Sequence, residues 1–166
     1  MDAHWNKKVE FKAFQTIVVG SGAAGLNAAL MLWKQGITDI AILSEGLNYG
    51  TSRNTGSDKQ TYYKLTTSGS EPDSVRRMAE ALFSGGCMDG DLALAEAAAS
   101  TRAFYHLVEI GVPFPCTPYG EYVGYKTDHD PCKRGISAGP LTSKYMTECL
   151  IREIQERNIP VFEGWQ

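Results

Sequence analysis

A glycine-rich turn between two contrasting segments constrains this chain more than any other feature. Its residues follow the pattern Gly-x-Gly-x-x-Gly and are Gly20, Ser21, Gly22, Ala23, Ala24 and Gly25. The turn follows Thr16–Val19, a β-branched apolar run that predicts a buried strand, and it opens an alanine- and leucine-rich segment that predicts a helix ending near Gly36. A second apolar run at 39–43 predicts another strand. Strand, helix and strand within about 30 residues indicate a βαβ unit with parallel strands and a right-handed crossover.

The spacing of this turn is the one that a dinucleotide-binding site requires. Gly20 allows a tight turn, Gly22 lets the backbone approach a pyrophosphate, and Gly25 lets the helix pack closely on the strand. The N–H groups at the helix start then hold the phosphates. The second strand ends on the candidate site residues Ser44, Glu45 and Gly46. Strand, glycine motif, helix, strand and acidic residue together favour a dinucleotide site over a purely structural turn. The carboxylate of Glu45 also favours a ribose with a free 2′-hydroxyl, which FAD and NAD share, over NADP.

The rest of the chain continues the α/β pattern. Helices are predicted at 70–84, 91–110 and 142–157, and a third strand at 159–162. The first of these helices opens on a capping pattern with proline in its first turn, Ser70-Glu71-Pro72-Asp73. In the second, the stripe interpreted as core is Leu92, Ala95, Ala99, Ala103, Leu107 and Ile110. We therefore predict a Rossmann-like α/β domain with a parallel sheet over 16–166, after a polar lead-in at 1–15. Three strands leave the edges of the sheet open, so the domain is expected to be incomplete in this chain.

Composition argues against several classes of protein. The 166 residues carry 16 Lys and Arg against 19 Asp and Glu, and the net charge of −3 speaks against nucleic-acid binding. No apolar stretch is long enough to span a membrane, and the N-terminus has no secretory signal. The four cysteines form no Cys-x-x-Cys pair, which speaks against a zinc site or a redox motif. Without a secretory signal they indicate reduced thiols and a cytoplasmic protein. Asp128-His129-Asp130 has metal-binding side chains, but adjacent residues rarely converge on one ion, so no metal site is expected.

Three stretches carry a more specific resemblance. They are TIVVGSGAAGLNAAL at 16–30, IAILSEG at 40–46 and GTSRNTG at 50–56. Together they resemble the FAD-binding start of the fumarate reductase/succinate dehydrogenase flavoprotein family. Residues 84–114, which end in GVPF, and residues 139–164 are similar to later parts of the same family. The resemblance covers nearly the whole chain and implies that the dinucleotide is FAD.

In this family the loop after the second strand wraps the pyrophosphate and reaches the flavin. The resemblance carries that role to Thr51, Ser52, Arg53, Asn54, Thr55 and Gly56. Members with covalent flavin have Ser-His-Thr where this chain has Ser-Arg-Asn, and Arg53 has no imidazole to alkylate, so the FAD is expected to be non-covalent. Arg53 either places positive charge near the phosphates or the reduced flavin, or is a solvated surface arginine. Residues 57–60, SDKQ, stand where the family tends to have Gly-Gly, which makes a backbone approach to the flavin ring less easy.

The resemblance implies the FAD-binding portion of a flavin-dependent oxidoreductase. In such enzymes the catalytic proton donors and carboxylate-binding residues come from other segments, so no catalytic residue is assigned. The expected substrate is a small molecule, with a carboxylate as the family-level expectation, and the expected partner is the remainder of the flavoprotein or a partner subunit. Two alternatives stay open. One is an NAD-binding Rossmann dehydrogenase domain, in which residues 50–57 have no ordered role, and the other is a non-catalytic nucleotide-fold interaction subunit.

Overall fold

The centre of the fold is a three-stranded parallel sheet. The computed structural model describes residues 11–57 and 60–164. The strands are β1 (Thr16–Val19), β2 (Ile40–Ser44) and β5 (Val161–Glu163), in the order β1-β2-β5. β2 is the central strand, with Ile42 opposite Val161 of β5. The predicted α/β class, the βαβ unit and the parallel strand pairing are confirmed.

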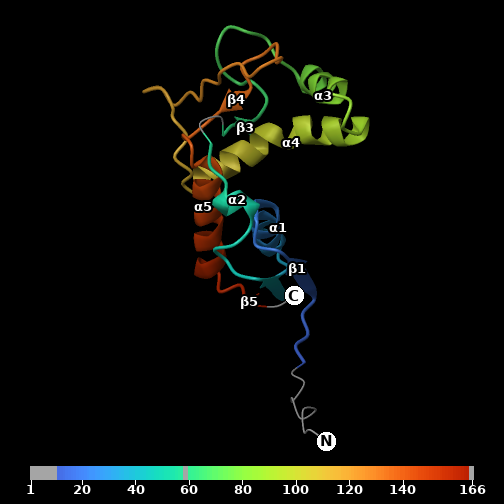
Figure 1. The fold of residues 1–166 in the computed structure, drawn as a ribbon, viewed down its shortest axis with the longest axis vertical. Helices are drawn as coiled ribbons and strands as arrows, with labels where there is room; N and C mark the ends of the chain where they lie inside the picture. The colour runs from blue at the N-terminus through green and yellow to red at the C-terminus, as the bar shows by residue number, and fades with distance from the viewer. Residues whose placement is uncertain (1–10, 58–59, 165–166) are drawn as a thin grey trace, which may run out of the picture.

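The helices divide into two groups along an elongated molecule (Figure 1). Helices α1 (Ala23–Lys34) and α5 (Thr142–Glu156) pack against each other beside the sheet, and the short α2 (Thr51–Asn54) contacts α5. Helices α3 (Val75–Ser84) and α4 (Gly90–Glu109) form a hairpin at the other end, near the small antiparallel pair β3 (Tyr62–Tyr63) and β4 (Gly135–Ile136). Within the described ranges, no helix combines the length and the apolar character that a membrane span requires.

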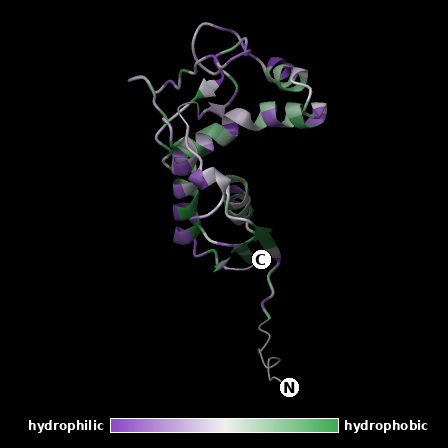
Figure 2. Ribbon diagram, in the orientation of Figure 1, coloured by the Kyte–Doolittle hydropathy of each residue, from purple (hydrophilic) through white to green (hydrophobic). Residues whose placement is uncertain are grey.

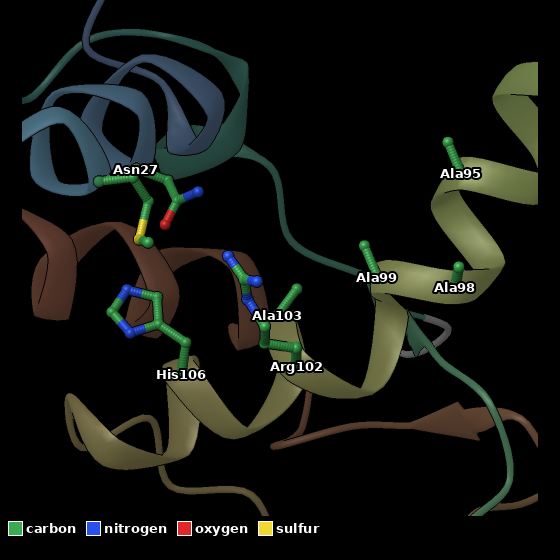
Figure 3. A pocket seen from close by; sticks show the side chains of 8 residues that line it. Asn27, Ala95, Ala98, Ala99, Arg102, Ala103 and His106 are labelled. Atoms are coloured by element: carbon green, nitrogen blue, oxygen red, sulfur yellow. The ribbon is translucent and has the colours of Figure 1, made fainter. Parts of the chain in front are cut away.

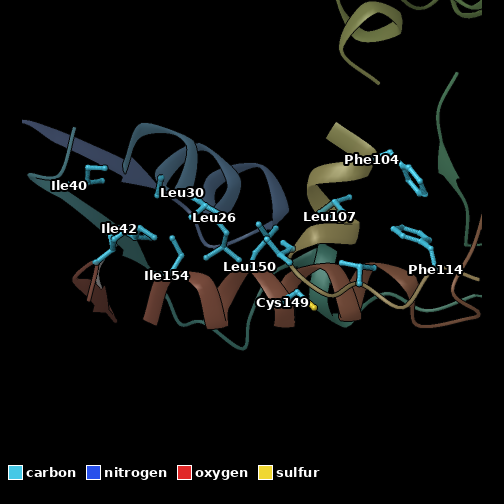
Figure 4. Packing of buried hydrophobic residues seen from close by; sticks show 14 of the residues in the cluster. Leu26, Leu30, Ile40, Ile42, Phe104, Leu107, Phe114, Cys149, Leu150 and Ile154 are labelled. Atoms are coloured by element: carbon cyan, nitrogen blue, oxygen red, sulfur yellow. The ribbon is translucent and has the colours of Figure 1, made fainter. Parts of the chain in front are cut away.

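The main core lies between the sheet and helices α1 and α5. Successive side chains of a strand point to opposite faces, so Ile40 and Ile42 point to the same face, and both are almost fully buried. Leu30 of α1 and Ile154 of α5 belong to the same cluster (Figure 4), which continues to Phe104 of α4. Burial of each such side chain contributes about 1.5–3 kcal/mol. The hydropathy of the residues agrees with this core (Figure 2): β1 and β2 are hydrophobic, whereas α5 alternates hydrophilic and hydrophobic residues.

The start of α3 differs from the sequence prediction. Ser74 is the N-cap, and its Oγ accepts a hydrogen bond from the N–H of Arg77 at 3.2 Å. The helix therefore begins at Val75, and the prediction that residues 70–73 open it was wrong. The physical reason is that the carboxylate of Asp73 binds the guanidinium of Arg134, a partner 61 residues away that no local pattern reveals.

The buried stripe of α4 also differs from the prediction. The helix buries Ala93, Ala97, Ser100, Phe104 and Leu107. Leu92 is 64% exposed, and Ala95, Ala99 and Ala103 are exposed as well, so the interpretation of these four as core was wrong. An alanine-rich helix offers two stripes with the same period, and the contact with Met78 and Ala79 of α3 selects the other one.

A buried ionic cluster around Arg134 fastens the loops beside α3 and α4. The Arg134 guanidinium donates to both carboxylate oxygens of Asp73 at 2.7 and 2.9 Å, to Asp130 Oδ1 at 3.1 Å and to Tyr63 Oη at 3.1 Å. The side chains of Arg134 and Asp73 are fully buried. Asp130 has a side chain of a kind that binds metals, but in the structure its carboxylate pairs with Arg134. In the described part of the chain, no group of three or more His, Cys, Asp or Glu side chains could hold a metal ion.

We expect this cluster to make stability depend on pH below about 4. Burial alone raises the pKa of Asp73, but hydrogen bonds from Arg134 and from the N–H groups of Thr66 and Ser74 outweigh it and lower the pKa to about 2. Because the folded-state pKa lies below the usual 3.8, the stabilisation is complete above the usual value and is lost as the pH falls toward 2. Urea unfolding across this range should show a smaller loss for Asp73→Asn than for the wild type. Equal losses would contradict this assignment.

Candidate functional site

A cavity of about 460 Å³ lies at the carboxyl ends of β1 and β2. Its lining residues are Val19, Gly20, Ser21, Gly22, Leu43, Ser44, Glu45, Tyr49 and Gly50. In a parallel sheet with helical crossovers, ligands bind at this edge because the helix N-termini point to it. The cavity therefore lies where the glycine-rich turn predicts a nucleotide.

The glycine turn has the geometry of a phosphate-binding turn. Gly20 has a φ of 100°, a left-handed conformation that favours glycine, and its N–H donates to the carbonyl of Leu43 at 2.7 Å. A Cβ on Gly25 would stand 2.2 Å from the carbonyl oxygen of Gly20, so only glycine lets α1 pass so close to the end of β1. Gly22 is the N-cap of α1 and provides no side-chain cap. The N-cap side chain therefore occupies none of the first N–H groups of α1, and only that of Ala23 has a side-chain acceptor, Ser52 Oγ, in the described part of the chain. Such a helix start suits an anionic ligand such as a pyrophosphate.

Two serines tie the glycine turn to the end of β2. Ser21 Oγ lies 2.6 Å from Ser44 Oγ, and both residues are buried. The Ser21 hydroxyl also lies 3.0 Å from the carbonyl of Gly46, whose N–H donates to Ser44 Oγ at 3.2 Å. These bonds fix the backbone on either side of Glu45, whose side chain is exposed at the cavity. Neither the pattern of the turn nor that of the strand revealed this serine pair, because the two residues are joined only by the parallel pairing of β1 and β2.

The loop after β2 is ordered and contains α2. Gly50 has a φ of 91°, and the Asn54 side-chain amide donates to the carbonyls of Asn48 at 2.9 Å and Gly50 at 3.0 Å. Ser52 Oγ accepts a hydrogen bond from the N–H of Ala23 at 3.4 Å, which brings α2 to the start of α1. Arg53 points away from this contact, toward α5, where Nη2 lies 3.3 Å from Glu148 Oε1.

The candidate residues from the sequence fall into two adjacent groups. Those that line the first cavity are Gly20, Ser21, Gly22, Ser44 and Glu45. Arg53, Asn54, Thr55 and Gly56 line a second cavity of about 390 Å³ together with Asn48, Leu141 and Lys144. Ala23, Ala24, Gly25, Gly46, Thr51 and Ser52 line neither cavity. Gly25, Gly46 and Ser52 contribute instead through the backbone approach and the hydrogen bonds described above.

Two residues near the first cavity were missed by sequence reasoning. Tyr49 lines it, and a Cβ on Gly46 would lie 3.2 Å from the Tyr49 ring, so the ring packs over this glycine. Glu163 of β5 accepts a hydrogen bond from the N–H of Leu47 at 2.6 Å, which fastens the loop to the edge strand. The position of Tyr49, four residues after Glu45, could have indicated a place at the cavity. Nothing in the sequence indicated the role of Glu163, because its partner Leu47 is 116 residues away.

Comparison with known proteins agrees with this geometry. The family model described as the FAD binding domain matches residues 15–165. The chain belongs to this FAD-binding family. No protein with a curated description matches the sequence significantly.

Solved structures share the fold of this FAD-binding domain at low sequence identity. Sdh1 of Mycobacterium smegmatis in complex with UQ1 is similar with a TM-score of 0.81 and 18% identity, over 91% of this chain and 27% of that one. A variant of the E. coli quinol fumarate reductase FrdA gives 0.74 and 20% identity, over 91% and 26%. The 3-ketosteroid-delta4-(5alpha)-dehydrogenase from Rhodococcus jostii gives 0.68 and 16%, over 91% and 38%. The predicted resemblance to the fumarate reductase/succinate dehydrogenase flavoproteins is confirmed, and the chain spans about a quarter of the length of the first two.

Proposed function

We propose that the cavity at the carboxyl ends of β1 and β2 holds the adenosine and pyrophosphate half of FAD. The observation that carries this proposal is the close approach of Gly25 to Gly20, where an ideal Cβ on Gly25 would lie 2.2 Å from the Gly20 carbonyl oxygen. This approach brings the N-terminus of α1, whose N-cap Gly22 has no side chain, to the cavity. The backbone of Gly22 and the N–H groups of the first turn of α1 would hold the phosphates. Glu45 would accept hydrogen bonds from the ribose, and the pair Ser21 and Ser44 keeps it in position.

FAD would supply the redox chemistry when bound, and the residues of this chain would bind and orient it. The family match is to FAD-binding domains, and no comparison favours the NAD-binding alternative. The ordered loop with α2 beside the first turn of α1 also differs from the expectation for an NAD-binding domain, in which residues 50–57 had no ordered role.

We propose that the cofactor is held without a covalent bond. Arg53 stands where covalent relatives carry histidine, and its guanidinium is paired with Glu148 at 3.3 Å. A guanidinium stays protonated at any physiological pH and has no free nitrogen lone pair that could form a bond to the flavin.

Acid precipitation tests this attachment. Protein saturated with FAD and freed of excess cofactor should release its flavin into the supernatant when acid unfolds the chain, because unfolding removes the site and leaves no covalent link. The absorption spectrum of the supernatant should be that of free FAD, as in a parallel sample of FAD alone. Flavin that remains in the washed precipitate would contradict non-covalent attachment. Protein that carries no flavin before precipitation would contradict FAD binding itself.

We also propose that the complete protein is a flavin-dependent oxidoreductase acting on a small molecule such as a carboxylate, with further polypeptide beyond these residues. The short span relative to the similar structures supports this, and so does an exposed groove of about 460 Å³ between α1 and α4. Figure 3 shows Ala95, Ala99 and Ala103 along one side of α4, with Asn27 of α1 across the groove from Arg102 and His106. Small exposed side chains in this number suit close packing against further protein, either the remainder of the flavoprotein or a partner subunit.

A further inference from the structure

Tyr49 is an exposed aromatic residue at the proposed nucleotide cavity. It lines the cavity and is 60% exposed, although aromatic side chains contribute most to stability when their rings are buried. In the described part of the chain, no other aromatic ring and no cation stacks on it. The ring therefore offers accessible apolar surface to a ligand of this cavity.

The loop after β2 holds the Tyr49 ring in a fixed position. The N–H of Tyr49 donates to the carbonyl of Gly46 at 3.1 Å, which closes a turn. A Cβ on Gly46 would lie 3.2, 3.4 and 3.7 Å from three ring carbons, so one side of the ring rests on this glycine. The side-chain amide of Asn54 donates to the carbonyls of Asn48 at 2.9 Å and Gly50 at 3.0 Å. These two residues flank Tyr49, so the ring stands on a fixed backbone, as a binding contact requires.

The cavity has a polar part and an apolar part. The glycine turn, Ser44 and Glu45 form the polar part, which would hold the pyrophosphate and the ribose. Val19, Leu43 and Tyr49 form the apolar part, in which Val19 is 82% exposed. The adenine of a dinucleotide presents two π faces, and such faces stack on aromatic side chains. The apolar part of the cavity therefore suits the base, as the polar part suits the phosphates.

The place of Tyr49 in the loop fits the base of the dinucleotide. Its ring rests on Gly46, the residue directly after Glu45, whose carboxylate would hold the ribose. The base is joined to this ribose at C1′, whereas the pyrophosphate is joined at C5′. The base therefore extends from Glu45 away from the glycine turn. Among the described residues, Tyr49 is the only aromatic one in the lining of this cavity.

We propose that the Tyr49 ring stacks on the adenine of the dinucleotide, and that the site depends on this base as well as on the phosphates. The inference rests on the proposed function, because it places the base relative to the ribose and the pyrophosphate. Stacking of a base on an aromatic side chain is worth about tenfold in affinity. ADP, which carries the base and the phosphates but no flavin, should therefore occupy the cavity by itself.

Fluorescence titrations test this contact with two ligands, FAD and etheno-ADP, an ADP analogue whose base fluoresces and is quenched when it stacks on an aromatic ring. Tyr49→Leu keeps an apolar side chain over Gly46 but removes the ring. It should bind FAD about tenfold more weakly than the wild type, and bound etheno-ADP should stay fluorescent even at saturation. Tyr49→Phe keeps the ring, so it should retain both the affinity for FAD and the quenching of etheno-ADP.

Tyr119→Leu is the matched control, because Tyr119 is 91% exposed and lines neither cavity, and it should behave as the wild type with both ligands. Because Tyr49 is exposed, its variants should stay folded, as circular dichroism would show. Three results would each overturn the stacking proposal and leave the proposed function standing: wild-type affinity of Tyr49→Leu for FAD, quenching of etheno-ADP by that variant, or no quenching by a wild type that binds FAD. Equal weakening of FAD binding in Tyr119→Leu would also overturn it. A wild type that binds no FAD would overturn both proposals.

Discussion

Gly25→Ala is expected to prevent stable folding of the chain. The new Cβ would stand 2.2 Å from the carbonyl oxygen and 3.1 Å from the carbonyl carbon of Gly20, and backbone atoms cannot yield as a flexible side chain can. Relief would require α1 to move away from β1, which would break the turn and the hydrogen bond from Gly20 to Leu43. We expect a loss of about 3 kcal/mol or more in the free energy of unfolding, measured by urea unfolding.

Gly22→Ala is the matched control for this prediction. A Cβ at this position would meet only Ser52 Oγ at 3.5 Å, an ordinary contact, and the φ of −73° is accessible to alanine. The variant should therefore stay folded, within about 1 kcal/mol of the wild type. If Gly25→Ala unfolds at the same urea concentration as the wild type, the close approach of α1 to the glycine turn is not a requirement of the fold.

Arg134→Met is expected to destabilise the chain by about 3–5 kcal/mol. The substitution leaves the buried carboxylate of Asp73 without its partner and removes one partner of Asp130. A buried charge without compensation costs far more than the pair contributes when it is intact. Burial lowers the pKa of Arg134, but its hydrogen bonds to Asp73 and Tyr63 outweigh this and hold the pKa above its usual value, so the residue is charged at any pH used.

A double variant separates lost charge compensation from lost packing. Arg134→Met combined with Asp73→Asn removes both members of the fully buried pair and should recover part of the lost stability. Arg76→Met removes an arginine from an exposed i,i+4 pair on α3 and should change stability little. A single variant Arg134→Met as stable as Arg76→Met would contradict the role of the buried cluster in joining the loops to α3.

Local signals predicted the part of the fold that carries the nucleotide site. The glycine turn connects β1 to α1 as expected, and the second apolar run forms β2, which pairs with β1 in parallel. This succeeded because the required backbone conformations, such as the φ of 100° at Gly20, leave few residue choices and so appear in the sequence. The strand β2, which ends at Ser44 directly before Glu45, was predicted from its apolar run.

The predictions failed where distant residues decide local structure. Asp73 was interpreted as part of a helix cap, but Arg134 takes its carboxylate, and Ser74 caps α3 instead. In α4 either alanine stripe could have been the buried one until α3 was placed against Ala93 and Ala97. The direction of Arg53 likewise depends on Glu148 of α5, a residue 95 positions later whose proximity no local pattern encodes.

Equilibrium titration with FAD, followed by quenching of flavin fluorescence, tests the central claim most directly. The wild-type chain should bind one FAD saturably, and NAD⁺ should not displace it. Gly22→Ala, checked by circular dichroism to be folded, should bind FAD at least about tenfold more weakly, because its Cβ blocks the approach of the pyrophosphate to the backbone and to the start of α1. Binding of FAD by Gly22→Ala with wild-type affinity, or displacement of FAD by NAD⁺, would contradict the assignment of this cavity to FAD.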